Sequence, residues 1–336
     1  MITIRSILEI FLLISISIQL LRLTRVAVKM SFPIINQIDP YKFLHIISNS
    51  EGTITRLLQF YPTIPPSTTN TSSPSLSKDV VINPDKNISI RMYLPRIRPN
   101  LFKKLPIVVF VHGGGFILCS VGTPTVHEFC SSLASHLTAL VVSVEYRHAY
   151  DDVLEALTWV KEGKDEWVNK YGDFSRCVLV CESAGENIVY NVGLMSVVKN
   201  NDFRPLIITG LVLVQSYFGG LDRTEPEVRL AYHPVLPKPL VGVNRSRVFE
   251  GRSSLSDQVT DLGWLVGAVT GCDDMPFFDL NVEFVKFLKS RGLDAKSMFD
   301  GGTYQGMFVS NATKMEELFV CNAIFVLDLS LHTSLC

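Results

Sequence analysis

Short apolar runs alternate with longer amphipathic segments along most of this chain. The run at 107–111 is continuously apolar, which is typical of a strand buried on both faces of a sheet. The segments between the runs place apolar residues at helical spacing. This alternation predicts an α/β domain with a mostly parallel central sheet flanked by helices. We expect strands at 88–94, 105–112, 139–147, 177–181, 208–216 and 264–271, and helices at 124–136, 151–171, 185–199, 278–291 and 314–331.

The region before the first predicted strand has a different character. Apolar residues at helical spacing predict a helix within 39–60, whereas the Pro/Ser/Thr-rich stretch at 62–77 is a loop that cannot sustain a core. We therefore divide the chain into a hydrophobic extension at 1–29, an N-terminal cap helix and loop at 30–77, and an α/β domain at 78–336.

Residues 7–21 form a nearly continuous apolar segment flanked by arginines. Its 15 residues suit the core of a signal peptide but fall short of the about 20 that a membrane-spanning helix needs. Three interpretations stay open: a non-structural extension upstream of Met30, a signal anchor, and a packed helix. The first favours a cytoplasmic or nuclear protein, and the second a membrane-anchored or secretory one.

Composition narrows the classes of function. A formal net charge of −1 gives no electrostatic reason to expect nucleic acid or an acidic membrane as a partner. The seven cysteines show no Cys-x-x-Cys pair, so we expect buried, reduced thiols. No cluster of His, Cys, Asp and Glu has metal-ligand spacing, and the glycine triplet at 113–115 is not followed by a phosphate-loop lysine. We expect neither a metal nor an organic cofactor.

A nucleophile turn is predicted where the strand at 177–181 runs into a Glu-Ser-Ala-Gly sequence and a helix follows. A serine at such a turn projects its hydroxyl above the sheet, and residues two positions away must be small because the strained backbone presses them against adjacent strands. Gly185 meets this requirement, and Cys181 stands where glycine is usual. Ser183 is therefore the candidate nucleophile. The amide of Ala184, at the helix N-terminus, is a candidate donor to an oxyanion.

The sequence His112-Gly113-Gly114-Gly115 directly follows another predicted strand. Three consecutive glycines let the backbone pass close to a substrate and direct its amides at one point. With the amide of Ala184 they would form an oxyanion hole, in which each donor is typically worth about 3–4 kcal/mol in the transition state. We expect His112 to hold this loop by hydrogen bonds rather than to carry protons.

These motifs, together with Gly271-Cys272-Asp273, resemble those of the plant carboxylesterase branch of the hormone-sensitive-lipase-like α/β hydrolases, which also contains the gibberellin receptor. The resemblance implies an α/β-hydrolase fold with a Ser–Asp–His triad. It implies Ser183 as the nucleophile and Asp273 as the acid, with Asp274 as the alternative. It also implies a small-molecule ester or hormone-like ligand as the partner. We expect a monomer or a weak dimer, with membrane contact only if 7–21 is an anchor.

The sequence departs from the family pattern in regions that shape the site. The family's proline-rich stretch after Arg147 is missing, and the cap region is shortened between 236 and 248. Glu186 follows Gly185, the glycine of the nucleophile turn, at a position where a small residue is usual. Because these segments would line the pocket, the identity of the substrate does not follow from the sequence.

The catalytic histidine is the most serious departure, since Tyr304 or Gln305 stands at its place. An amide cannot take the serine proton, and a tyrosine with a pKa of about 10 is protonated at neutral pH. His332 and His148 are the remaining candidates for a base. His127 and His136, on a predicted helix, are expected to pack or to lie on the surface, and His233, in the shortened cap segment, is not a candidate base.

Three interpretations therefore compete. The chain is a carboxylesterase-like serine hydrolase of small carboxylic esters with impaired turnover, a non-catalytic small-molecule binder on a hydrolase scaffold, or a degenerate gene product. The two internal losses favour a degenerate gene product over a small-molecule binder, because a receptor would keep its lid and pocket. The intact Ser183, glycine loop and Asp273 favour descent from an active enzyme. Impaired ester hydrolysis is our hypothesis.

Overall fold

The computed structural model describes residues 46–50, 54–57, 62–70, 72–97, 103–147, 149–198, 203–217, 224–230, 265–292 and 295–304. The predicted extension at 7–21, the shortened cap at 236–248 and the last predicted helix at 314–331 lie outside these residues. No helix in the described ranges is long and apolar enough to cross a membrane.

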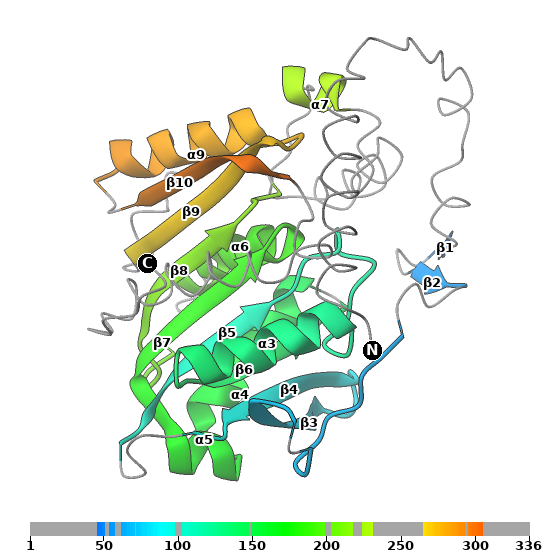
Figure 1. Cartoon of the computed structure of the whole chain (residues 1–336), viewed down its shortest axis with the longest axis vertical. Helices are drawn as coiled ribbons and strands as arrows, with labels where there is room; N and C mark the ends of the chain where they lie inside the picture. Colours follow the sequence, from blue (N-terminus) through cyan, green and yellow to red (C-terminus); the bar gives the residue numbers. More distant parts are fainter. Residues whose placement is uncertain are drawn as a thin grey trace, which may run out of the picture. The chain divides into compact units, whose positions relative to one another are not determined.

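An eight-stranded sheet organises the described part of the chain, with strand order β10-β9-β8-β7-β5-β6-β4-β3 (Figure 1). The five pairings from β6 through β10 are parallel, and the two at the β3 edge are antiparallel. The predicted mostly parallel sheet is thereby confirmed. Its strands are β3 (Ser75–Asn83), β4 (Ile88–Pro95), β5 (Leu105–Val111), β6 (Leu140–Glu145), β7 (Gly172–Glu182), β8 (Ile208–Val214), β9 (Leu265–Asp274) and β10 (Lys296–Tyr304).

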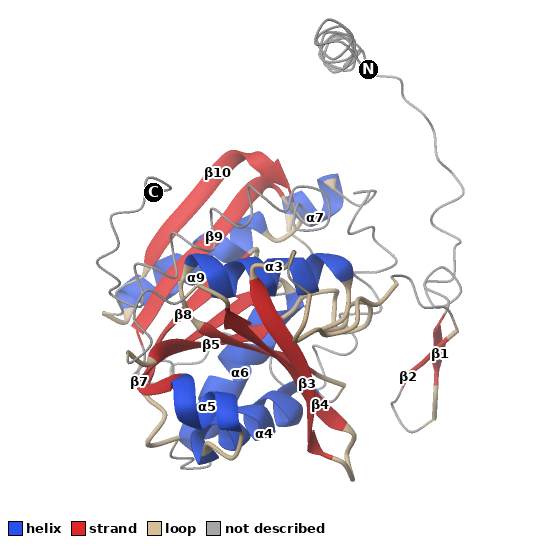
Figure 2. Cartoon of the chain, turned by 60° about the horizontal axis from the view of Figure 1, so that its bottom comes forward, coloured by secondary structure: helices blue, strands red, loops and turns tan. Residues whose placement is uncertain are grey.

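Helices cover both faces of this sheet (Figure 2). Alternate residues of β5 explain how, because Val108 and Phe110 belong to the core under α3, whereas Val109 and Val111 belong to the core under α4 and α6. A strand with two buried faces has no polar side, which is why its sequence is continuously apolar. The helices are α3 (Pro124–His136), α4 (Ala149–Glu162), α5 (Glu166–Tyr171), α6 (Ala184–Val198), α7 (Glu225–Arg229) and α9 (Phe278–Ser290).

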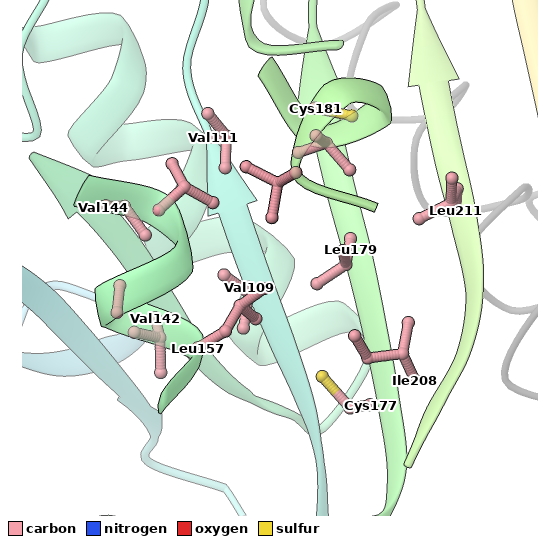
Figure 3. Packing of buried hydrophobic residues seen from close by; sticks show 14 of the residues in the cluster. Val109, Val111, Val142, Val144, Leu157, Cys177, Leu179, Cys181, Ile208 and Leu211 are labelled. Atoms are coloured by element: carbon pink, nitrogen blue, oxygen red, sulfur yellow. The ribbon is translucent and has the colours of Figure 1, made fainter. Parts of the chain in front are cut away.

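Close packing in the larger core fixes the strand that carries the candidate nucleophile. Leu179 and Cys181 of β7 lie between Val109 and Val111 of β5 on one side and Leu211 of β8 on the other (Figure 3). All of these side chains are fully buried. The carboxyl end of β7 is therefore held between two parallel neighbours before the chain turns into α6.

The predicted N-terminal helix is wrong in the residues that the structure describes. Two short antiparallel strands, β1 (Ile46–Ser48) and β2 (Ile54–Arg56), pair there instead. β-branched residues such as Ile47 and Thr55 favour extended backbone, and the polar residues between the strands favour a turn. Over so few residues, apolar positions at this spacing fit two three-residue strands as well as they fit a helix.

Among the further boundaries that differ from the prediction, two have a clear physical cause. The loop predicted to extend to residue 77 ends earlier, because β3 begins at Ser75 and joins the sheet beside β4. Its buried positions are serines, and the hydroxyl of Ser75 lies 2.7 Å from that of Ser131 on α3. The helix predicted over 151–171 is two helices, because Gly163 has a φ of +60° and Asp165 caps the second helix through the amide of Trp167.

Candidate active site

Ser183 occupies a strained turn between β7 and α6. Its φ is +53°, in the left-handed region that non-glycine residues rarely adopt. Its amide donates to the carbonyl of Val214 on β8 at 2.8 Å, and its carbonyl accepts from the amide of Glu186 at 3.1 Å. The sheet on one side and the first turn of α6 on the other therefore hold this conformation.

The residues on either side of the turn show why it needs small side chains. A Cβ atom on Gly185 would lie 2.1 Å from the carbonyl oxygen of Val111 and 2.9 Å from that of His112, so only glycine fits. Cys181 is fully buried, and its thiol donates to the carbonyl of Val212 at 3.5 Å. The cysteine that replaces the usual glycine is thus accommodated without disturbing the strand pairing.

The glycine loop starts at the carboxyl end of β5, beside this turn. Nδ1 of His112 lies 2.8 Å from the carbonyl oxygen of Gly113, and since a carbonyl only accepts, Nδ1 carries the proton. The His112 ring stacks on Tyr146 at 4.4 Å between centroids. The Tyr146 hydroxyl donates to the carbonyls of His112 and Gly113 at 2.8 and 3.1 Å. His112 therefore has partners suited to holding the loop.

The middle of the loop has backbone angles suited to glycine. Gly114 and Gly115 have φ values of +94° and +60°. A Cβ atom on Gly114 would lie 2.8 Å from the amide nitrogen of Cys119. The carbonyl of Gly114 also accepts from the amides of Ile117 and Leu118, at 3.1 and 2.9 Å, so the loop folds tightly back on itself.

A buried carboxyl group lies against the first loop glycine. A Cβ atom on Gly113 would come within 2.2 Å of Oε2 of Glu182, the residue before Ser183. Burial raises the pKa of Glu182 to about 7, and the nearby amide of Gly113 opposes that rise. Among the described contacts, no carboxyl group competes for the amides of the other predicted oxyanion donors, which are Gly114, Gly115 and Ala184.

A second buried acid, Glu186, lies on the first turn of α6. Burial raises its pKa to about 8. The hydroxyl of Ser216 opposes the rise but does not reach hydrogen-bond geometry with either carboxyl oxygen, so both oxygens lack a partner among the described residues. A neutral carboxylic acid is the form that such an apolar setting favours near pH 7.

The far end of the loop is tied to the antiparallel side of the sheet. Glu145, the last residue of β6, accepts from the amide of Val121 at 2.9 Å. Arg91 on β4 donates to the carbonyl of Ile64 at 2.7 Å and pairs with Asp79 on β3. These contacts, with those of Tyr146 and Glu182, were missed by sequence reasoning. The only signal in the sequence is that Glu145 and Tyr146 stand side by side at the end of a predicted strand.

Aromatic side chains flank the candidate nucleophile. Phe116, directly after the glycine loop, meets Tyr217 edge to face at 6.2 Å, and Tyr217 meets Phe277 at 4.5 Å. The amide of Tyr217 also donates to the carbonyl of Ser183 at 3.3 Å. Among the described residues, a group of aromatic side chains therefore lies beside the turn that carries Ser183.

The backbone places the other predicted triad positions at neighbouring strand ends. Asp273 and Asp274 end β9, and Tyr304 ends β10 in parallel register with Asp274. The carboxyl ends of β7, β9 and β10 face the same edge of the sheet, where α/β enzymes place their sites. Gln305, His148, His233 and His332 lie outside the described residues.

Two histidines that were expected to be structural lie away from Ser183, on α3. Nδ1 of His127 lies 3.1 Å from the guanidinium of Arg91 and 3.2 Å from the hydroxyl of Tyr93. Burial and the nearby Arg91 charge lower the pKa of His127 to about 4. His136 is exposed near the end of the helix. Among the described residues, no group of three or more His, Cys, Asp or Glu side chains could hold a metal ion.

Comparisons with known proteins agree with this architecture. A family model for the alpha/beta hydrolase fold matches residues 108–261. Carboxylesterase 20 of Arabidopsis thaliana is 39% identical over 320 residues, which cover 86% of this chain and 96% of the relative. The 3-O-acetylpapaveroxine carboxylesterase CXE1 of Papaver somniferum is 33% identical over 86% of this chain and 99% of its own length.

Solved structures show the same fold. A thermostable carboxylesterase cloned from a metagenomic library, EstE1, superposes with a TM-score of 0.64 over 77% of this chain and 90% of its own, at 23% identity. The hyperthermophilic esterase of Pyrobaculum calidifontis gives a TM-score of 0.64 over 76% of this chain and 85% of its own, also at 23% identity.

Proposed function

This chain belongs to the plant carboxylesterase branch of the α/β hydrolases, and we propose that it is a serine hydrolase of small carboxylic esters whose turnover is impaired by the loss of the triad histidine. Its class, a carboxylesterase-like hydrolase, follows from the family. The residue roles and the impairment are our proposal.

Ser183 is the proposed nucleophile. Its strained turn keeps the hydroxyl at the carboxyl end of β7, where an ester carbonyl can approach the glycine loop. The amides of Gly114, Gly115 and Ala184 would stabilise the oxyanion that forms when Ser183 Oγ attacks the carbonyl carbon. Asp273 would orient a protonated base, as the acid of a triad does.

The step without an assigned residue is removal of the serine proton. The observation that supports impairment is the parallel register of Tyr304 with Asp274, which brings the end of β10 beside the end of β9. The resemblance to the family puts its histidine at the position of Tyr304 or Gln305. Loss of a triad histidine costs on the order of 10⁶ in turnover in a serine protease, and the oxyanion hole and binding retain roughly 10³–10⁴ over water.

A non-catalytic role in binding a small molecule is the second candidate. The intact geometry around Ser183 and the glycine loop favours it, because both are kept in detail although no base is assigned. A degenerate gene product is the third, and the missing stretch after Arg147 supports it, since α4 begins at Ala149 almost directly after β6.

Hydrolysis of short-chain p-nitrophenyl esters by the full-length chain and its Ser183→Ala variant separates these candidates. We expect slow turnover that exceeds the variant. His332→Ala and His148→Ala would then show whether either histidine has taken over as base. Folded protein that does not differ from Ser183→Ala would overturn the hydrolase proposal. A ligand-dependent rise in Tm without turnover would then support the binder, and failure to fold would support the degenerate product.

A further inference from the structure

The amide of Gly113 lies against a carboxyl group that belongs to the nucleophile turn itself. A Cβ atom on Gly113 would lie 2.2 Å from Oε2 of Glu182 and 3.1 Å from its carbonyl oxygen. Glu182 is 6% exposed and pairs through its backbone with Val214 of β8. The carboxyl group therefore joins the residue before the nucleophile to the first glycine of the loop.

The peptide groups at the start of the loop are held from two sides. Tyr146 donates to the carbonyls of His112 and Gly113. The carboxyl group of Glu182 lies against Gly113, and the amide of Gly113 favours the ionised form of that group. The contacts of Tyr146 and Glu182 therefore converge on the start of the loop, from which the chain enters Gly114.

We propose that Glu182 is a positioning residue, whose carboxylate holds the amide of Gly113 and thereby aims the amides of Gly114 and Gly115 at the oxyanion. The catalytic consequence rests on the proposed function above, whereas the hydrogen bond does not. A carboxylate accepts a shorter and stronger hydrogen bond than a neutral carboxyl group. The loop is therefore held more firmly when Glu182 is ionised.

The ionisation of Glu182 falls in an accessible pH range, because burial raises its pKa to about 7. The groups near it are the thiols of Cys119 and Cys181, with two further carboxyl groups, Glu145 near Cys119 and Glu186 near Cys181. Burial raises the pKa of both thiols, so they stay neutral through this range. The test must therefore distinguish Glu182 from Glu145, Glu186 and the adjacent loop residue His112.

The amide of Gly113 can be observed alone. His112-Gly113 is the only His-Gly step in the sequence, so a chain labelled with carbonyl-¹³C histidine and ¹⁵N glycine gives one amide-to-carbonyl NMR correlation, that of Gly113. We expect its proton shift to move with a midpoint near pH 7 and to move downfield as pH rises, because the hydrogen bond strengthens. A shift that stays constant between pH 5.5 and 8.5 would overturn the proposal.

Variants assign the titration. Glu182→Gln keeps an acceptor but cannot ionise, so its Gly113 signal should not titrate. Glu145→Gln, at the other end of the loop, and Glu186→Gln should keep the wild-type titration. If the titration persists in Glu182→Gln, His112 or another neighbour causes it and the proposal is wrong.

The catalytic arm uses p-nitrophenyl ester hydrolysis in the same variants. Misplacement of a catalytic group by about 1 Å can cost roughly 100-fold. We expect Glu182→Gln to lower kcat by about 10- to 100-fold with little change in KM, and to remove the inflection near pH 7 from the pH profile. An unchanged kcat would contradict the positioning role. Absence of turnover in the wild type would contradict the proposed function alone, because the NMR titration is independent of it.

Discussion

Gly185 lies directly against the carbonyl oxygen of Val111, where a Cβ atom would come within 2.1 Å of that oxygen. Val111 ends β5 and Gly185 follows the nucleophile, so this contact sets how closely the turn can approach the start of the glycine loop. The spacing between nucleophile and oxyanion donors is therefore fixed by backbone atoms, which cannot move as a side chain can.

Gly185→Ala is predicted to destabilise the chain through this contact. Overpacking of this kind costs about 1–3 kcal/mol, and rigid backbone places it at the upper end. Urea unfolding should show the loss. Gly292→Ala is the control: a Cβ atom there meets nothing within 4 Å, although its φ of +76° is strained for alanine. That variant should lose only about 1–2 kcal/mol, and an equal loss in both would argue against the close approach at Gly185.

Glu186→Gln is predicted to change how stability depends on pH. The folded-state pKa of Glu186 is about 8, above its ordinary value of 4.5. The unfolded chain therefore loses this proton first, and the wild type loses stability as pH rises from about 4.5 to 8. The glutamine of the Glu186→Gln variant has no such proton to lose, so the Tm of this variant should rise relative to that of the wild type as pH increases over that window.

A surface variant provides the control for that measurement. Glu162 is 40% exposed in its ion pair with Lys164, and Glu162→Gln should follow the wild-type pH dependence. A Tm difference between Glu186→Gln and wild type that is the same at pH 5 and pH 8.5 would show that Glu186 is not buried as described.

Tyr146→Phe is predicted to loosen the start of the glycine loop. The variant keeps the ring that stacks on His112 and loses the hydroxyl that donates to the two carbonyls. Leaving buried acceptors without a donor costs about 1–3 kcal/mol. Tyr150→Phe is the matched control, because it also loses one hydroxyl, which donates to Asn187 of α6 at 2.9 Å rather than to the carbonyls of His112 and Gly113. We expect both to lower Tm, and Tyr146→Phe alone to lower ester turnover further. Equal turnover in the two variants would contradict a role for Tyr146 in shaping the loop.

The sequence predicted the central strands well because burial on both faces leaves a continuous apolar run, as in β5 and β8. It failed at the edges. β3 buries Ser75, which bonds to α3, and Ser77, and β10 carries Lys296, Asp300 and two glycines, so neither strand gives an apolar pattern. The N-terminal strand pair was mistaken for a helix because each strand has only three residues.

The candidate site, like the fold, could be predicted from the sequence only in part. Ser183, Gly185 and the glycine triplet could be proposed from the sequence because the chemistry of an ester hydrolase needs those residue types at those spacings. The carboxyl groups of Glu182 and Glu186 were not recognised as buried, because their burial depends on β5, β8 and α6 meeting in space. Local sequence does not carry that information.

Restoration of the histidine tests the central claim most directly. Tyr304→His and Gln305→His place an imidazole where β10 ends beside β9, and each is compared with wild type in p-nitrophenyl ester hydrolysis. We predict that one of them raises kcat by at least about 100-fold, because a positioned general base contributes roughly 10²–10⁴. That gain should disappear when Ser183→Ala is added. Wild-type turnover that matches an active esterase, depends on Ser183 and is not increased by either histidine would contradict the account, because a base would already be in place.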